Sequence, residues 1–175
     1  MPWDYDFHHS RIGFVASHFG LTLVHGHFQR ADIKLDIDDD DPTKSTIEAT
    51  IDAASLTTDF QRRDDAVKGQ DYYLEVGRFP TITFKSKRIE HRGDNRYAVI
   101  GDFTLHGVTR ELTLDTTYTG EATDARGVTL RGLAARATIR KGDFGIKGSP
   151  LEPNIAEEIQ IVLDLELHKR ESNVG

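Results

Sequence analysis

Hydrophobic and polar residues alternate along most of this chain, which is the pattern of strands with one buried face. The longest case lies near the C-terminus, where Ile159, Ile161, Leu163, Leu165 and Leu167 are separated mostly by polar residues. Comparable segments occur at residues 12–16, 33–37, 47–51, 81–85, 97–105, 112–118 and, more weakly, 128–139. The pattern therefore predicts an all-β protein with about eight strands.

Short turn signals separate these segments. The run Asp39-Asp40-Asp41-Pro42 interrupts the chain after the second segment, and Arg92-Gly93-Asp94-Asn95 and His106-Gly107 are typical of hairpin turns. Residues 123–127 form another such signal. Strands joined by short turns pair antiparallel, and about eight of them suit a closed barrel. We expect an extended eight-stranded antiparallel β-barrel.

One segment departs from the strand pattern. Thr58-Asp59-Phe60-Gln61 matches a capping box, with Thr58 as the N-cap and Gln61 three residues later. A short helix would follow over residues 61–68, with Gly69 just beyond its end. The sequence thus predicts a helical insertion around residues 59–76. No linker or repeat is visible, so we expect residues 1–175 to form a single domain.

The interior of such a barrel should be apolar, because alternate side chains point inward and these faces are aliphatic and aromatic. Periodicity alone favours a lumen filled by the protein's own side chains. The alternative is a cavity for one apolar ligand. Gly26, Gly101 and Gly132 lie in strand patterns, where they either leave room for a ligand or mark bends of the barrel.

Composition and charge exclude several classes of function. The 22 basic and 29 acidic residues give a net charge of −7, without a basic block, so we expect no nucleic-acid partner. The absence of cysteine excludes disulfides, zinc–thiolate sites and thiol catalysis. No apolar run approaches the roughly 20 residues that span a membrane. No signal-peptide pattern is visible either, so we expect a cytoplasmic protein.

The motifs of common enzymes and metal sites are missing. No serine lies in a G-x-S-x-G context, and no glycine-rich phosphate loop precedes a helix. Among the eight histidines, His25 and His27 share a strand face, but no carboxylate accompanies them at a recognisable spacing. The acidic run 38–41 lacks the glycine and distal glutamate of a calcium loop. We expect no catalytic residues, no metal site and no cofactor.

Several motifs, taken in order, resemble the YceI-like family of lipocalin-like proteins. The most specific is Gly101-Asp102-Phe103-Thr104-Leu105-His106-Gly107-Val108-Thr109-Arg110, which is similar to the family's G-D-L-T-[IL]-[HKR]-G-V-T-[KR] signature. The resemblance extends from Trp3 to about Lys169 and includes Asp6, His9-Ser10, Ile12-Gly13-Phe14, His18-Phe19-Gly20, Gly26-His27-Phe28, Asp52-Ala53-Ala54-Ser55-Leu56-Thr57-Thr58, Arg63-Asp64, Phe79-Pro80-Thr81-Ile82-Thr83-Phe84-Lys85-Ser86 and Asp143-Phe144-Gly145-Ile146.

The resemblance implies a lipocalin-like barrel whose lumen binds a polyisoprenoid, an isoprenoid quinone or its precursor, or a fatty-acid derivative. It makes a homodimer plausible, and since many relatives are exported, a periplasmic or secreted location is the alternative to a cytoplasmic one. Two positions depart from the family pattern. Ala66 stands where members often carry histidine, and Lys141 stands where the R-x-D-F-G motif has arginine. Lysine does not reproduce a guanidinium fork, so the head group bound here is expected to differ.

We expect the protein to be a carrier, with a barrel enzyme acting on a lipid-like substrate and a ligandless scaffold as alternatives. Several candidates have a second interpretation: His18 as a histidine bonded to a backbone carbonyl, and Arg63-Asp64 as a buried ion pair that pins the helix. Tyr72 and its neighbour Tyr73 could line the entrance or simply pack. The candidate lumen residues are Phe14, His18, Phe28, Phe84, Phe103 and Phe144. The candidates for the mouth and the ligand head group are Thr58, Arg63, Asp64, Tyr72 and Lys141.

Overall fold

The computed structural model describes residues 2–151 and 155–171. Its elements are mostly strands, with one α-helix, α1 (Gln61–Gly69). The strands are β1 (Pro2–Tyr5), β2 (Arg11–His18), β3 (Thr22–Phe28), β4 (Ala31–Asp36), β5 (Thr46–Asp52), β6 (Leu56–Thr57), β7 (Thr81–His91), β8 (Arg96–Leu105), β9 (Val108–Thr123), β10 (Thr129–Arg140) and β11 (Ile155–Lys169).

Eight of these strands close into a ring. The sheet order runs β1-β4-β5-β7-β8-β9-β10-β11, and β1 pairs with β11 as well as with β4. Every pairing is antiparallel. The predicted eight-stranded antiparallel barrel is therefore confirmed.

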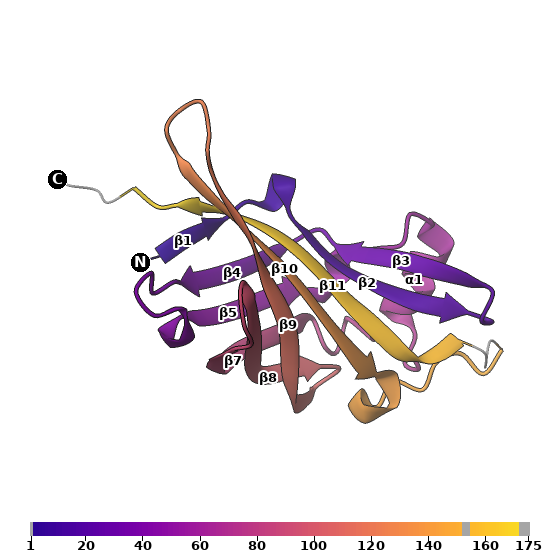
Figure 1. The fold of residues 1–175 in the computed structure, drawn as a ribbon. Helices are drawn as coiled ribbons and strands as arrows, with labels where there is room; N and C mark the ends of the chain where they lie inside the picture. Colours follow the sequence, from indigo (N-terminus) through magenta and orange to yellow (C-terminus); the bar gives the residue numbers. More distant parts are fainter. Residues whose placement is uncertain (1, 152–154, 172–175) are drawn as a thin grey trace.

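The barrel is extended at one end because its first strand is interrupted. The last residues of β11 pair with β1, whereas residues 159–164 pair with β2. Between β1 and β2 lies the 3₁₀ turn η1 (Phe7–His9). The β2–β3 hairpin continues past the ring, and β6 pairs with β3 there. In Figure 1 this hairpin and α1 lie at one end of the molecule, while the chain termini lie at the other.

The helix lies where it was predicted, but its capping box does not form. The helix begins at Gln61, its N-cap residue is Phe60, and no side chain caps it. The hydroxyl of Thr58 instead donates to Asp64 Oδ1, and Asp59, with a φ of +64°, turns the chain before the helix. Gly69 is the last helical residue and Gln70 the C-cap, so the helix ends one residue later than predicted and Gly69 lies inside it.

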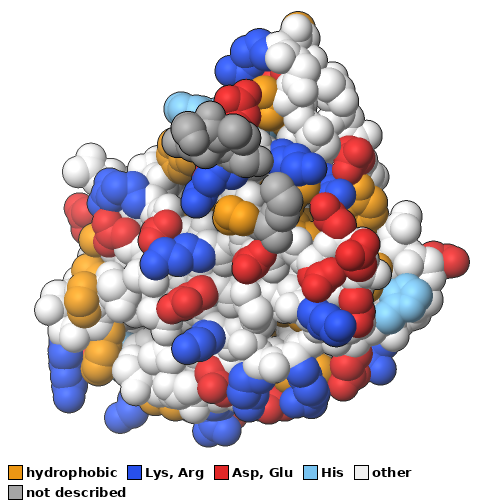
Figure 2. Space-filling model, turned by 90° about the vertical axis from the view of Figure 1, so that its left-hand side faces the viewer, with side chains coloured by type: hydrophobic (Ala, Val, Ile, Leu, Met, Phe, Trp, Pro, Cys, Tyr) orange, Lys and Arg blue, Asp and Glu red, His pale blue; other side chains and the backbone are white. Residues whose placement is uncertain are grey.

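The end of the barrel near the chain termini is plugged. Trp3 and Leu167 are the most deeply buried large side chains of the described residues, at 1 % and 0 % exposure. They pack with Leu35, and the guanidinium of Arg131 lies 4.5 Å from the centre of the Trp3 ring. Figure 2 shows this end from outside, where acidic and basic side chains are interspersed over most of the surface.

Candidate functional site

The barrel encloses a cavity of about 690 Å³ rather than a filled core. This volume lies within the range of roughly 300–1,000 Å³ typical of small-molecule sites. Strands on all sides of the barrel contribute aliphatic and aromatic side chains to its lining, and α1 and the turn after it complete the lining at one end. The lumen can therefore hold one apolar molecule.

The floor of the cavity is apolar and lies against the Trp3 plug. Ile33, Ile47, Leu133 and Leu165 line the cavity and also pack against the buried cluster around Trp3. None of the described lining residues at this floor is titratable. A barrel enzyme would be expected to bring acid and base groups together there.

Five of the six predicted lumen residues line the cavity. They are Phe14, His18, Phe28, Phe84 and Phe103. The rings of Phe14 and Phe28 lie 5.9 Å apart, across paired strands β2 and β3. Phe144 is 3 % exposed and packs edge-on against Phe103, 5.5 Å away, but it is not among the described residues that line the cavity.

The glycines singled out in the strand pattern do not leave empty space. A side chain at Gly26 would overlap the ring of Phe14, and one at Gly101 would meet the ring of Phe84. Gly132 in turn accommodates the hydroxyl of Thr119. Of the two interpretations given to these glycines, the structure does not support room for a ligand, since side chains of the protein occupy that space.

The mouth of the cavity is positively charged. Among the described residues that line the cavity, the charged side chains are Arg62, Arg63 and Lys141, joined by His18, and none is a carboxylate. All four come from elements at the same end of the barrel, on the right in Figure 1: α1, the end of β2 and the start of the 3₁₀ turn η4 (Lys141–Phe144). A ligand group that accepts hydrogen bonds or carries negative charge is favoured there.

Arg63 and Asp64 do not form the ion pair that was one of their two interpretations. Both side chains bind Thr58 instead. Asp64 Oδ1 accepts from Thr58 N at 2.7 Å and from Thr58 Oγ1 at 2.5 Å, and Oδ2 accepts from Thr57 Oγ1 at 2.9 Å. Arg63 donates from Nε to Thr58 Oγ1 at 2.7 Å and from Nη2 to Thr58 O at 2.8 Å.

Asp64 and Arg63 have different roles in this hydrogen-bond network. Asp64 is 7 % exposed and does not line the cavity, so it anchors α1 to the chain before it. Burial alone would raise the pKa of Asp64, but the hydrogen bonds from Thr58 and Thr57 outweigh that effect and hold the pKa below its ordinary value. Thr58 and Arg63 both line the cavity, so the network also fixes the polar edge of the mouth.

Lys141 and the tyrosines complete the mouth. Lys141 is 9 % exposed, and its Nζ lies 3.3 Å from Glu157 Oε2. Tyr72 does not line the cavity; the neighbouring Tyr73 does, and the two rings meet edge-on at 5.0 Å. The sequence offered both tyrosines for the entrance, but Tyr72 was chosen over Tyr73, and Arg62 was missed. The turn after α1 and one face of a short polar helix have no period that assigns an inward side.

Comparison with known proteins agrees with this geometry. The model of the YceI-like domain matches residues 3–167. A protein of Pseudomonas savastanoi pv. phaseolicola named UPF0312 protein is 34 % identical over 140 residues, which is 80 % of this chain and 72 % of that protein. A UPF0312 protein of Yersinia pestis is 33 % identical over 158 residues, covering 90 % of this chain and 80 % of its own length.

Solved structures share the fold at lower identity. BcnA of Burkholderia cenocepacia has a TM-score of 0.84 at 22 % identity, over 93 % of this chain and 99 % of that one. A polyisoprenoid binding domain from Saccharophagus degradans has a TM-score of 0.70 at 14 % identity, over 97 % and 98 % of the two chains. None of the described helices is long and apolar enough to cross a membrane. By the extent of the domain match and the identity to its relatives, the chain belongs to the YceI-like domain family.

Proposed function

We propose that this protein binds one long apolar or amphiphilic chain in its lumen and acts as a carrier or store for it. The observation that carries the proposal is the apolar cavity of about 690 Å³, closed at the Trp3 end and lined by basic groups at the other. The fold relative from Saccharophagus degradans, described as a polyisoprenoid binding domain, supports the same class of ligand.

Burial of apolar surface is sufficient to explain such binding. A prenyl or acyl chain that buries a few hundred Å² gains roughly 5–10 kcal/mol at about 25 cal/mol per Å². Association and chain ordering take back several kcal/mol of this gain. At the upper end of this range a cost of about 4 kcal/mol leaves about 6 kcal/mol, which corresponds to a dissociation constant of roughly tens of micromolar without any special polar chemistry.

The two ends of the cavity set the orientation of the ligand. Its tail lies toward the Trp3 plug, where the lining is aliphatic, and its head group lies beside Arg62, Arg63 and Lys141. Cationic donors at the mouth favour a head group with acceptor oxygens, such as a carboxylate, a phosphate or a quinone carbonyl. An isoprenoid quinone, its precursor and a fatty-acid derivative all meet this requirement.

A chain-length series tests the proposal directly. Saturated fatty acids of increasing length would be titrated into purified protein freed of bound lipid, and affinity measured by calorimetry. Each added methylene that enters the lumen should contribute about 0.8 kcal/mol, or roughly fourfold in affinity, until the tail reaches the plug. Beyond that length, the affinity should stay constant as further methylenes are added. Affinities that are unmeasurable or independent of length would refute a lumenal chain site.

A further inference from the structure

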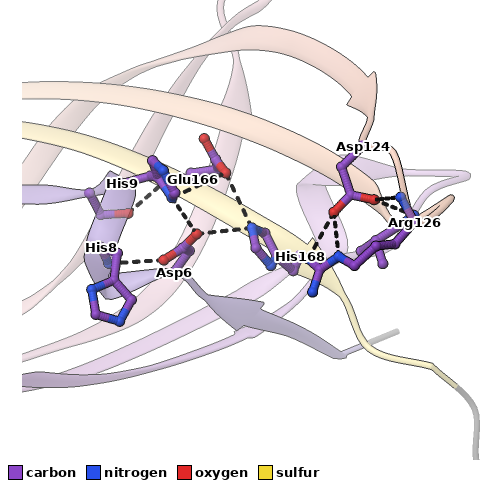
Figure 3. Close-up of polar contacts among 9 residues, drawn as sticks. Asp6, His8, His9, Asp124, Arg126, Glu166 and His168 are labelled. Carbon is purple, nitrogen blue, oxygen red and sulfur yellow. Dashed lines mark hydrogen bonds and ion pairs between the residues drawn. The ribbon is translucent and has the colours of Figure 1, made fainter.

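A second cluster of side chains lies outside the lumen, where the two ends of the chain meet. Asp6 follows β1 directly, and Glu166 and His168 lie on the last part of β11. Because side chains alternate along a strand, the placement of Leu165 and Leu167 in the core puts Glu166 and His168 together on the opposite face. Figure 3 shows the three side chains pointing toward one another, with His9 beside them.

Two of the distances between the ligating atoms of this cluster are close to those around a bound metal ion. His168 Nε2 lies 3.0 Å from Asp6 Oδ2 and 3.2 Å from Glu166 Oε1, and all three atoms lie within 4.8 Å of one another. Zinc bonds to nitrogen and oxygen of about 2.0–2.2 Å place neighbouring ligand atoms about 3.3–3.5 Å apart in a tetrahedral site. Small side-chain shifts therefore suffice to surround an ion.

His9 supplies a fourth nitrogen at the edge of the cluster. Its Nδ1 lies 2.8 Å from Asp6 Oδ2 and 3.9 Å from Glu166 Oε1. The His9 side chain is 68 % exposed, so it can rotate toward an ion without displacing packed groups. Two imidazoles and two carboxylates form a donor set that suits zinc and similar divalent transition ions.

The charge of the cluster also favours a cation. Asp6 and Glu166 bring two carboxylates together, and no lysine or arginine among the described residues lies within 4 Å of either one. Their partners are His9 and His168, whose charge depends on protonation. A divalent ion would neutralise both carboxylates at once.

The backbone holds the cluster together without help from an ion. Asp6 Oδ1 accepts a hydrogen bond from His8 N at 2.9 Å, and the Asp6 side chain is only 10 % exposed. Asp6 N donates to Glu166 O at 2.9 Å, and Glu166 N donates to Ser10 Oγ at 2.9 Å. Two segments from opposite ends of the sequence are thus fixed beside each other, which lowers the ordering cost of binding.

We propose that Asp6, Glu166 and His168 form a binding site for a divalent transition-metal ion of the zinc class, with His9 as its fourth donor. The site does not depend on a ligand in the lumen. A bound ion would link the turn after β1 to β11 and so stabilise the strand that closes the barrel. An ion that binds only the folded state raises the midpoint temperature of thermal unfolding.

The test uses zinc chloride and tag-free, full-length protein treated with a chelator. Calorimetry should show one saturable site with micromolar or tighter affinity, and zinc should raise the thermal midpoint. His168→Gln and Glu166→Gln should each weaken binding roughly tenfold or more, since each removes a ligand. Fluorescence of Trp3, the single tryptophan of the chain, would verify that the variants keep the closed strand.

The matched control is His25→Gln. His25 is exposed on β3, away from the cluster in the fold, so its loss should leave zinc affinity unchanged. Absence of saturable zinc binding in the wild-type protein would overturn the proposal. So would zinc binding that survives in folded His168→Gln and Glu166→Gln, because the ion would then be held elsewhere. In either case the cluster would serve only to hold the two ends of the chain together by hydrogen bonds.

Discussion

The ring of Phe14 occupies the space directly above Gly26, its partner on the neighbouring strand. A Cβ at position 26 would overlap the ring, so the glycine is what allows Phe14 to lie flat against β3 and line the lumen. The ring of Phe84 likewise lies against Gly101 of β8, although the register partner of Gly101 on β7 is Ser86. Glycines in this barrel thus set how far aromatic rings retract from the cavity.

Gly26→Ala should therefore destabilise the protein by about 1–3 kcal/mol, the usual cost of an inserted methyl group in a packed interior. The displaced Phe14 ring would also narrow the lumen. Chemical denaturation measures the first effect. Gly69→Ala is the control, because nothing lies within 4 Å of a Cβ there and stability should stay equal or rise. Equal stability of the Gly26→Ala variant would contradict the packing described here.

Ala135→Trp should block the lumen while the barrel stays folded. Ala135 lines the cavity on β10 and is flanked by Thr116 of β9 and Leu163 of β11, which also line it. An indole there would occupy ligand space, so we expect at least tenfold weaker binding of palmitate by calorimetry. Thr138→Trp on the exposed face of the same strand should bind as the wild type does. Equal binding by both variants would place the ligand outside the lumen.

Arg62→Gln tests the charge of the mouth. Arg62 lines the cavity and is exposed, and its side chain makes no hydrogen bond or ion pair with another described residue, so the fold should not change. An exposed charge pair contributes about 0.2–1 kcal/mol, so palmitate affinity should fall roughly 1.5- to 5-fold. Hexadecanol affinity should not change. Lys68→Gln, which alters a cation of α1 outside the lining, should affect neither ligand.

Asp64 should make the free energy of unfolding depend on pH in the acid range. Its pKa in the folded protein lies below the ordinary value of 3.8, because hydrogen bonds from Thr58 and Thr57 outweigh the opposing effect of burial. The stabilisation is thus fully present above the unfolded pKa and is lost as pH falls through the folded pKa. Asp64→Asn should cost about 1–3 kcal/mol at pH 7 and flatten the decline of stability below pH 4.

Denaturation curves between pH 2.5 and 7 would measure this dependence. Asp65→Asn is the control, because Asp65 is exposed on the same helix. Its acid profile should match that of the wild type. An Asp64→Asn profile that runs parallel to the wild-type profile would mean that Asp64 does not hold the helix in the way its hydrogen bonds indicate.

Much of the fold was predictable because it follows from short-range patterns, namely the alternation of hydrophobic and polar residues and the turn motifs. The alternation from Ile159 to Leu167 reports a strand with one buried face, and the turn at Arg92–Asn95 reports a hairpin; both are present. The strand β1 was not foreseen, since Pro2–Tyr5 is too short to show a period. Its role in closing the ring depends on pairing with β11, which is distant in sequence.

The candidate site was predictable on its strands and less so in its irregular parts. Phe14, Phe84 and Phe103 follow the inward period of their strands, so their place in the lumen could be foreseen. Tyr72 was chosen over Tyr73 without a period to decide between them, and Phe144 lies in a 3₁₀ turn. The cluster of Asp6, Glu166 and His168 was invisible because no sequence spacing links opposite ends of a chain.

The central claim is that the lumen holds one long chain. Native mass spectrometry of freshly purified protein, followed by solvent extraction and analysis of the released molecule, tests it most directly. The account predicts a stoichiometric added mass in the range of a prenyl or fatty chain, absent from the Ala135→Trp variant. A wild-type protein that carries no such mass, and acquires none when incubated with isoprenoid quinone or long-chain fatty acid, would contradict the account.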